Sequence, residues 1–234
     1  MPIEKESKKF ITDSPKTNFF FGLILGVAIV AILGFGGILL TRDNPTDNLG
    51  DENGDVAGAE EEVVVDLQIN ENDLVLGNPD APVKVFEFSD FQCPYCAMFH
   101  EVMHQIVDEY DGQVVWVYKQ FPIASHPLGM PGAIATECAN EQGKFWEMSD
   151  MIFANQDTLT EASFEEYAEE LGLNLEAYQS CVADERYYEK ILTDYNLGVE
   201  NGVRGTPTNF VNNEMVPGAV PYENMKAIID ELLQ

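Results

Sequence analysis

Residues 89–96 read Ser-Asp-Phe-Gln-Cys-Pro-Tyr-Cys, and they connect two different hydrophobic patterns. The preceding segment, Val83–Phe88, is largely apolar and has the length of a buried strand. After the cysteines, apolar residues recur at helical spacing as far as about Tyr110. The sequence therefore predicts a strand that leads directly into a helix, with two cysteines at the junction.

The spacing of the two cysteines places both sulfurs on the first turn of this helix, close enough to form a disulfide. Pro94 suits the first helical position, where a missing N–H costs no hydrogen bond, and Cys93 is then the N-cap. The Cys93 sulfur would face unpaired backbone N–H groups and the positive end of the helix dipole, which both favour the thiolate. Cys93 is the predicted nucleophile, and Cys96 is the predicted resolving thiol.

Two other uses of a C-x-x-C pair compete with redox chemistry. A zinc site would take His100 and His104 from the same helix, but Cys93 and His104 lie roughly 16 Å apart along the helix axis. One ion with ligand bonds of about 2 Å cannot hold both. A structural disulfide usually closes a long loop and seldom lies at a strand-to-helix junction. Redox chemistry is therefore the leading interpretation, and the site is expected to hold no metal.

An uncharged hydrophobic run extends from Phe19 to Leu40. As a helix it would measure about 33 Å, against a bilayer hydrocarbon core of about 30 Å. Four lysines precede the run and only Arg42 follows it closely, so the positive-inside rule places residues 1–18 in the cytoplasm. The alternative is a cleaved signal peptide, but the run is longer than a usual signal and no A-x-A-like site follows. We expect a single-pass anchor at 19–40 in the cell membrane, with the rest of the chain outside.

Composition excludes several classes of protein. A chain of 234 residues with 45% hydrophobic content can bury a real core, which excludes a disordered chain. The 41 acidic residues outnumber the 12 basic ones, and the formal net charge of −29 argues against nucleic-acid binding. All four cysteines follow the hydrophobic run, and an oxidising compartment suits them.

A linker and a globular domain follow the predicted anchor. Residues 41–62 are acidic and lack apolar periodicity, which predicts a flexible tether. The domain covers residues 63–234, and alternating apolar residues at Val65, Leu67 and Ile69 predict its first strand. Val114–Phe121 is nearly continuous apolar sequence and predicts a central strand, so the cysteine helix lies within a β-α-β unit.

The remaining sequence changes from helical to strand patterns. Five helices are predicted at about Leu128–Asn140, Lys144–Asn155, Phe164–Leu171, Leu175–Ala183 and Arg186–Glu200. Two short strands, at Thr208–Val211 and Met215–Val216, and a final helix follow. The predicted order is thus β-α-β, a helical segment over about 125–203, and β-β-α.

This α/β order resembles the thioredoxin fold. The resemblance is carried by Cys93-Pro94-Tyr95-Cys96 at the β-α junction and by Gly205-Thr206-Pro207-Thr208 before the β-β-α ending. The helical insertion makes the chain similar to the DsbA-like thiol-disulfide oxidoreductases. Further matching stretches are residues 86–92, 142–146 and 202–205, and the resemblance spans about 74–233.

The resemblance implies roles for several further residues. Pro207 would be a cis proline beside the disulfide, and the backbone of Thr206 would receive an extended segment of substrate. Glu87 matches a buried acid that assists proton movement at the inner thiol. A buried acid must be paired or have a raised pKa, and Lys119 on the next predicted strand is a candidate partner. The alternative is a solvated Glu87 at a sheet edge.

The other two cysteines, Cys138 and Cys181, lie in two different insertion helices. A disulfide between them would close a loop of about 43 residues and would stabilise the fold by up to ~4 kcal/mol. Two buried free thiols are the alternative. The expected compartment and the even number of cysteines favour the disulfide.

The leading functional hypothesis is a membrane-anchored enzyme that introduces disulfides into unfolded or partly folded secreted proteins without a cofactor. The resemblance implies a quinone-linked membrane partner that reoxidises the cysteines. The motif departs from the C-P-H-C of strongly oxidising members, because Tyr95 cannot supply a positive charge to the Cys93 thiolate. A reductase or isomerase of the same fold, and a peptide-binding module without enzymatic activity, therefore stay open as alternatives.

Overall fold

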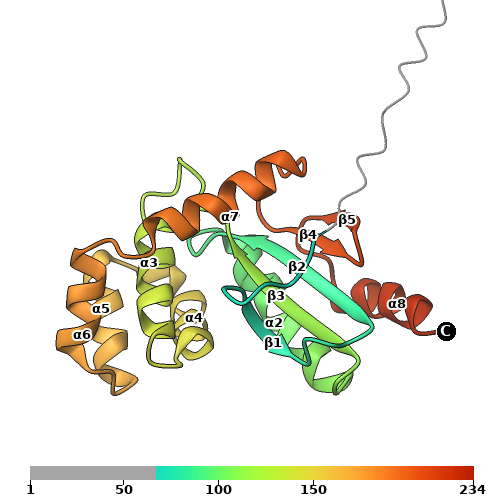
Figure 1. Cartoon of the computed structure of the whole chain (residues 1–234), viewed down its shortest axis with the longest axis horizontal. Helices are drawn as coiled ribbons and strands as arrows, with labels where there is room; N and C mark the ends of the chain where they lie inside the picture. Colours follow the sequence, from blue (N-terminus) through green and yellow to red (C-terminus); the bar gives the residue numbers. More distant parts are fainter. Residues whose placement is uncertain (1–66) are drawn as a thin grey trace, which may run out of the picture. The chain divides into compact units, whose positions relative to one another are not determined.

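The computed structural model of the chain describes residues 67–234 (Figure 1). The predicted cytoplasmic segment 1–18, the anchor at 19–40 and the linker at 41–62 lie outside the described residues. Among residues 67–234, none of the helices combines the length and the apolar character needed to cross a membrane.

The described residues form a mixed sheet with helices. The strands are β1 (Leu74–Gly77), β2 (Val83–Ser89), β3 (Val114–Gln120), β4 (Thr208–Val211) and β5 (Glu214–Pro217). The helices are α2 (Pro94–Glu109), α3 (Gly129–Asn140), α4 (Phe145–Ala154), the 3-10 turn η1 (Gln156–Thr158), α5 (Glu161–Glu170), α6 (Leu175–Ala183), α7 (Tyr188–Glu200) and α8 (Tyr222–Leu232).

The sheet has the strand order β1-β3-β2-β4-β5. Its central strands β2 and β3 are parallel, and α2 connects them. The other three pairings are antiparallel. Both central strands consist mostly of buried residues, as a sheet covered on both faces requires.

Alternate residues of the central strands pack into two separate cores. Val85 and Trp116 face the core that also contains residues of α2 and α8. Phe86 and Phe88 face the other core, against which residues of α7 pack. A Cβ atom at Gly198 of α7 would lie 2.8 Å from the rings of Phe88 and Phe121, so glycine allows α7 to lie this close to the sheet.

The helical insertion occupies the chain between β3 and β4. Figure 1 shows α3, α4, α5 and α6 gathered beside one end of the sheet, away from α8. A disulfide joins Cys138 of α3 to Cys181 of α6, with a Cα–Cα distance of 5.8 Å. The mixed α/β thioredoxin-like fold with a helical insertion is thus the fold predicted from the sequence.

The first strand differs from its prediction. The alternation at Val65, Leu67 and Ile69 predicted a strand, but residues 67–70 have no regular structure. Leu67 is buried against the core on the α7 side of the sheet, so the apolar period reflects one-sided packing of a segment that has no strand partner. The first strand of the described residues is β1, which follows a turn in which Asn70 donates two hydrogen bonds to the Asp73 carboxylate.

Candidate redox site

Both cysteines of the C-x-x-C motif lie where β2 ends and α2 begins. Cys93 is the N-cap of α2, with extended backbone angles (φ −81°, ψ 119°), and Pro94 is the first helical residue. Tyr95 follows it and is 61% exposed. Both cysteines are free thiols in this structure. Cys93 retains 4% of its surface exposed and Cys96 retains none, so an incoming sulfur meets Cys93 first.

The environment of Cys93 favours its thiolate. The pKa of Cys93 is lowered to about 6, chiefly because the side chain of Cys96 hydrogen-bonds to its sulfur. Partial burial opposes this shift, whereas the backbone N–H groups of Tyr95 and Cys96 at the start of α2 add to it. The thiolate is therefore the main form of Cys93 at neutral pH.

Cys96 has the opposite character. Burial raises the pKa of its thiol well above the ordinary value, and its hydrogen bond to Cys93 and the nearby charge of Glu87 act in the same direction. The backbone N–H of Asp90 lies 3.5 Å from the Cys96 sulfur and donates to it. The pair thus combines an acidic outer thiol with a weakly acidic inner one.

Glu87 is fully buried, which excludes the solvated alternative. Its Oε2 accepts a hydrogen bond of 2.9 Å from Trp116 Nε1, and its Oε1 has no partner among the described residues. Burial raises the pKa of Glu87 to about 8. Burial therefore keeps Glu87 protonated at neutral pH, and its electrostatic interaction with both cysteines shows that this acid lies near the thiols.

The expected pairing of Glu87 with Lys119 is wrong. In the parallel ladder Glu87 lies opposite Tyr118, while Lys119 lies opposite Phe88, so the two side chains point to opposite faces of the sheet. Lys119 instead forms ion pairs with Asp73 and Asp194, both of which are also buried. A proton-transfer role for Lys119 at the thiols is therefore excluded by its position.

The loop before β4 completes the site. The peptide bond between Thr206 and Pro207 is cis. The Cys93 sulfur lies 3.3 Å from the carbonyl oxygen of Thr206, across 113 positions of sequence, and donates a hydrogen bond to it when Cys93 is protonated. A hollow of about 400 Å³ lies along this loop and is bordered by Arg204, Thr206, Pro207 and Met215. The structure thus brings the sequence-predicted Thr206 and Pro207 next to Cys93.

The surface around Cys93 carries exposed apolar side chains. Tyr95 and Met98 on the first turns of α2 are each 61% exposed, and Met215 beside the hollow is 43% exposed. Exposed methionine and aromatic side chains adapt to varied apolar segments. The first turns of α2 and the β5 end of the hollow thus present apolar side chains to solvent.

The structure adds residues that the sequence did not point to. The Asp90 carboxylate accepts hydrogen bonds from the backbone N–H groups of Gln92 and Ile123 and lies 3.0 Å from His126 Nδ1, which fixes the loop before Cys93. Gln156, in the turn after α4, donates to the carbonyl oxygens of Phe91 and Cys93. No local pattern marks these residues, because each acts on a segment distant in the sequence.

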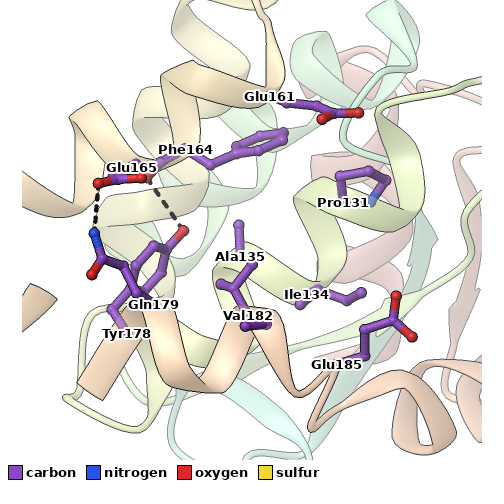
Figure 2. A pocket seen from close by; sticks show the side chains of 11 residues that line it. Pro131, Ile134, Ala135, Glu161, Phe164, Glu165, Tyr178, Gln179, Val182 and Glu185 are labelled. Carbon is purple, nitrogen blue, oxygen red and sulfur yellow. Dashed lines mark hydrogen bonds between the residues drawn. The ribbon is translucent and has the colours of Figure 1, made fainter. Parts of the chain in front are cut away.

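A second hollow lies within the helical insertion (Figure 2). It has a volume of about 450 Å³, and α3, α5 and α6 form its walls. Phe164 and Tyr178 give it an apolar lining, while Gln179 donates a hydrogen bond of 2.6 Å to Glu165 at its rim. Neither Cys93 nor Cys96 borders it, so the redox site is separate from this hollow.

The fold and the paired cysteines together define a protein of the thioredoxin class. A family model described as thioredoxin matches residues 69–231, and the chain belongs to this family. A solved thioredoxin-like oxidoreductase from Silicibacter pomeroyi DSS-3 is 29% identical, with a TM-score of 0.62 over 69% of this chain and 92% of that one.

More distant structures share the fold. Wolbachia pipientis alpha-DsbA1 is 23% identical, with a TM-score of 0.64 over 71% of this chain and 93% of that one. BdbD from Bacillus subtilis is also 23% identical, with a TM-score of 0.61 over 69% of this chain and 93% of that one. The helical insertion is therefore part of a fold shared with DsbA-like proteins.

Curated sequence relatives have a different overall size. The chain is 36% identical over 172 residues to a protein named Na(+)/H(+) antiporter NhaA 3 from Salinispora tropica. This match covers 72% of the chain but 26% of that protein. The chain thus spans about a quarter of the length of the curated relatives it matches, and their name describes those longer proteins.

Proposed function

We propose that this oxidoreductase donates disulfides to unfolded or partly folded secreted proteins outside the cytoplasm. The observation that carries the proposal is the cysteine pair at the start of α2, whose outer sulfur lies beside the carbonyl oxygen of Thr206. The lowered pKa of Cys93, at about 6, favours the donor direction. A stabilised thiolate favours the reduced form of the pair and so makes the pair more oxidising than one with an unperturbed cysteine. The disulfide form would then pass its bond to substrates readily.

The exchange proceeds in two steps that conserve sulfur bonds and electrons. A substrate thiolate attacks the sulfur of Cys93, so that a mixed disulfide forms and Cys96 leaves as a thiolate. A second substrate thiolate then attacks the substrate sulfur of this mixed disulfide, and Cys93 leaves as a thiolate. The substrate gains one disulfide and loses two electrons, which the cysteine pair accepts.

Glu87 has a defined part in the first step. The inner thiolate formed on Cys96 is buried and has a strongly raised pKa, so it requires a proton. Glu87 is buried near it and carries a proton at neutral pH, since its own pKa is about 8. It can therefore protonate Cys96 directly or through water and regain the proton from solvent afterwards.

Substrate binding would use the Thr206–Pro207 loop. The carbonyl oxygen of Thr206 is next to the attacked sulfur, and an extended segment could accept and donate backbone hydrogen bonds there as an added strand. The adjacent hollow and the exposed Tyr95, Met98 and Met215 would contact apolar side chains of the segment without selecting one sequence.

The proposal also covers where the protein lies and how its cysteine pair is reoxidised. The hydrophobic run at 19–40 and the lysines before it support a single-pass membrane protein whose catalytic domain faces outward. The reduced pair must lose two electrons before the next turnover. A quinone-linked membrane protein would supply an acceptor, and the anchor would keep the domain near it.

The decisive experiment is the equilibrium reduction potential of the Cys93–Cys96 pair, measured on the full chain in glutathione buffers. A value near −120 mV supports a disulfide donor, and a value near −270 mV assigns a reductant instead. Intermediate values would agree with an isomerase, which Tyr95 in place of histidine makes the second candidate. The Cys138–Cys181 disulfide is followed separately by mass spectrometry, so that its reduction is not mistaken for that of the active pair.

Turnover with reduced ribonuclease A tests the mechanism. Cys93→Ser should abolish the regain of ribonuclease activity, and so should Cys96→Ser, because a single cysteine cannot carry a disulfide to the reduced substrate. With a substrate that contains disulfides, Cys96→Ser should instead accumulate a mixed disulfide on Cys93, because Cys93 attacks the substrate disulfide and the thiol that would release it is missing. A peptide-binding module without catalysis would instead form complexes that survive thiol blocking and leave no Cys93-linked partner. Turnover by the Cys93→Ser variant would refute the assigned nucleophile.

A further inference from the structure

Three side chains of the kinds that bind metals converge where α2 packs against α4, one turn beyond Cys96. His100 and His104 are four residues apart on α2 and so project from the same face. Their Nε2 atoms lie 3.2 Å apart, and both point at Oδ1 of Asp150 on α4, at 2.6 and 3.0 Å. Neither cysteine belongs to this cluster.

The spacing of these three atoms is close to that of a metal's ligands. Nitrogen and oxygen ligands bound to zinc at about 2.0–2.1 Å are separated by about 3.3 Å in a tetrahedral shell. The two imidazole nitrogens already have this separation within ~0.1 Å. The Asp150 oxygen needs to move outward by about 0.7 Å from His100 and about 0.3 Å from His104 to reach the same separation. The half-exposed side chain of Asp150 permits this movement.

The two imidazoles are held in place by aromatic rings. His100 is 4% exposed and packs against Trp116 and Phe153, with ring centroids 5.1 and 4.7 Å away. His104 packs edge-on against Trp116 at 5.4 Å. Because packing fixes both rings, an ion would meet ligands that are already oriented.

A hollow beside the cluster leaves room for a further ligand. It has a volume of about 530 Å³, and His104, Asp150, Glu101 and Phe153 are among the residues that line it. Water or the carboxylate of Glu101 could complete a four-coordinate shell from this side. The formal net charge of −29 also attracts cations to the protein.

We propose that His100, His104 and Asp150 bind a divalent first-row transition-metal ion, with zinc the best match. Two imidazoles and one carboxylate are ligands that zinc commonly takes, and they suit it better than calcium or magnesium, which prefer oxygen. The ion would cross-link α2, which carries the redox pair, to α4 of the insertion. The sequence predicted no metal. It did not point to this site, because Asp150 is 46 positions from His104 and lies outside the helix that carries both histidines.

Zinc titration calorimetry on the full chain tests this proposal. The Cys93–Cys96 disulfide is kept formed during the titration, so that cysteine thiolates do not bind zinc. His104→Ala and Asp150→Asn are the ligand variants, since both side chains are partly exposed and their replacement spares the core. His126→Ala is the matched control, because it removes the histidine that lies by Asp90 outside the cluster.

We expect one zinc ion per wild-type chain and a loss of affinity of roughly 100-fold or more in each ligand variant, beyond the 10–100-fold typical of outer-shell changes. The His126→Ala variant should keep wild-type affinity. Zinc should also raise the midpoint of thermal unfolding of the wild type and of His126→Ala, but not of the ligand variants. Because all four proteins share the acidic segment 41–62, any zinc that this segment binds would add equally to each titration.

Cobalt provides an independent readout. Co²⁺ bound to nitrogen and oxygen ligands of the protein gives visible absorption bands that differ from those of the hydrated ion, and these bands should vanish in His104→Ala and Asp150→Asn. The proposal is overturned if the oxidised wild-type chain binds no stoichiometric zinc. It is equally overturned if both ligand variants bind zinc and cobalt as the wild type does.

Discussion

The carboxylate of Glu87 accepts a 2.9 Å hydrogen bond from the indole nitrogen of Trp116, on the face of the sheet that also carries the cysteines. This bond satisfies one carboxyl oxygen and leaves the other without a partner among the described residues. The acid is held in an apolar core beside the thiols, and burial raises its pKa to about 8. Glu87 can therefore hold a proton near the thiols, and its burial also destabilises the folded domain when the carboxyl group ionises.

Glu87 should make the stability of the domain depend on pH. Between its ordinary pKa of 4.5 and its folded-state pKa of about 8, the folded protein holds a proton on Glu87 that the unfolded chain releases. The free energy of unfolding should therefore fall as pH rises, by about 3 kcal/mol between pH 5 and pH 8. Glu87→Gln should remove this slope while keeping a side-chain oxygen for Trp116.

Urea unfolding of the disulfide form at pH 5, 6.5 and 8 measures this effect, since neither active-site cysteine titrates in that form. The exposed Glu223→Gln on α8 is the control and should keep the wild-type pH dependence. Identical slopes in wild type and Glu87→Gln would show that Glu87 is ionised in the folded protein, and the proton-donor role would fail.

The reactivity of Cys93 should follow its lowered pKa. We expect the rate of alkylation by iodoacetamide to rise with an apparent pKa of about 6, against about 8.5 for an unperturbed cysteine. Because the hydrogen bond from Cys96 is the largest cause, Cys96→Ala should raise the pKa of Cys93 and slow alkylation at pH 6 several-fold.

Mass spectrometry of the alkylated peptide assigns the reaction to Cys93. Cys93→Ser serves as the blank, since the remaining buried Cys96 should react slowly at every pH tested. An alkylation profile centred near pH 8.5 in the wild type would contradict a stabilised thiolate and, with it, the proposed oxidising direction.

Local patterns predicted most of this fold. The strand-to-helix junction at residues 83–96, the five insertion helices and the β-β-α ending depend on hydrophobic period and turn residues, which are visible in sequence. The prediction of the first strand was wrong, because Leu67 and Ile69 alternate for a different reason. These two side chains pack on one side of a segment that has no strand partner. Period alone does not distinguish these two cases.

The sequence predicted the site residues that are close together in the chain, and it missed the contacts between segments that are distant in the chain. Cys93 and Cys96 share one helical turn, so their spacing was informative. The side of the sheet on which Lys119 lies depends on strand register, and the sequence did not specify that β3 pairs Tyr118 with Glu87. Asp150 and Gln156 belong to the insertion. Asp150 contacts His100 of α2, and Gln156 donates to the carbonyl oxygen of Cys93. Hydrophobic periodicity in the sequence does not reveal contacts between such distant segments.

The buried cluster around Lys119 should be structural. Lys119→Met removes the cation that Asp73 and Asp194 share and leaves Asp194 with the longer ion pair to Lys190, so we expect a loss of up to roughly 3–5 kcal/mol in the free energy of unfolding. The reduction potential of the cysteine pair should stay unchanged, because Lys119 lies on the other face of the sheet.

Lys144→Met is the matched control. Lys144 forms an ion pair with Glu147 in which both side chains are exposed to solvent, so its loss should cost less than about 1 kcal/mol. Urea unfolding and glutathione equilibration of both variants supply the two readouts. A shift of the potential by more than about 30 mV in Lys119→Met alone would mean that Lys119 does influence the thiols.

The Cys138–Cys181 disulfide should stabilise the insertion without taking part in exchange. It links α3 to α6 across a sequence separation of 43, and the loop-entropy relation gives up to ~4 kcal/mol for a loop of this size. The double variant Cys138→Ala/Cys181→Ala should therefore unfold at lower urea concentration. It should still oxidise reduced ribonuclease A at 25 °C at close to the wild-type rate, because Cys93 and Cys96 are intact. Loss of turnover in a double variant that remains folded by circular dichroism would instead place the second cysteine pair in the electron path.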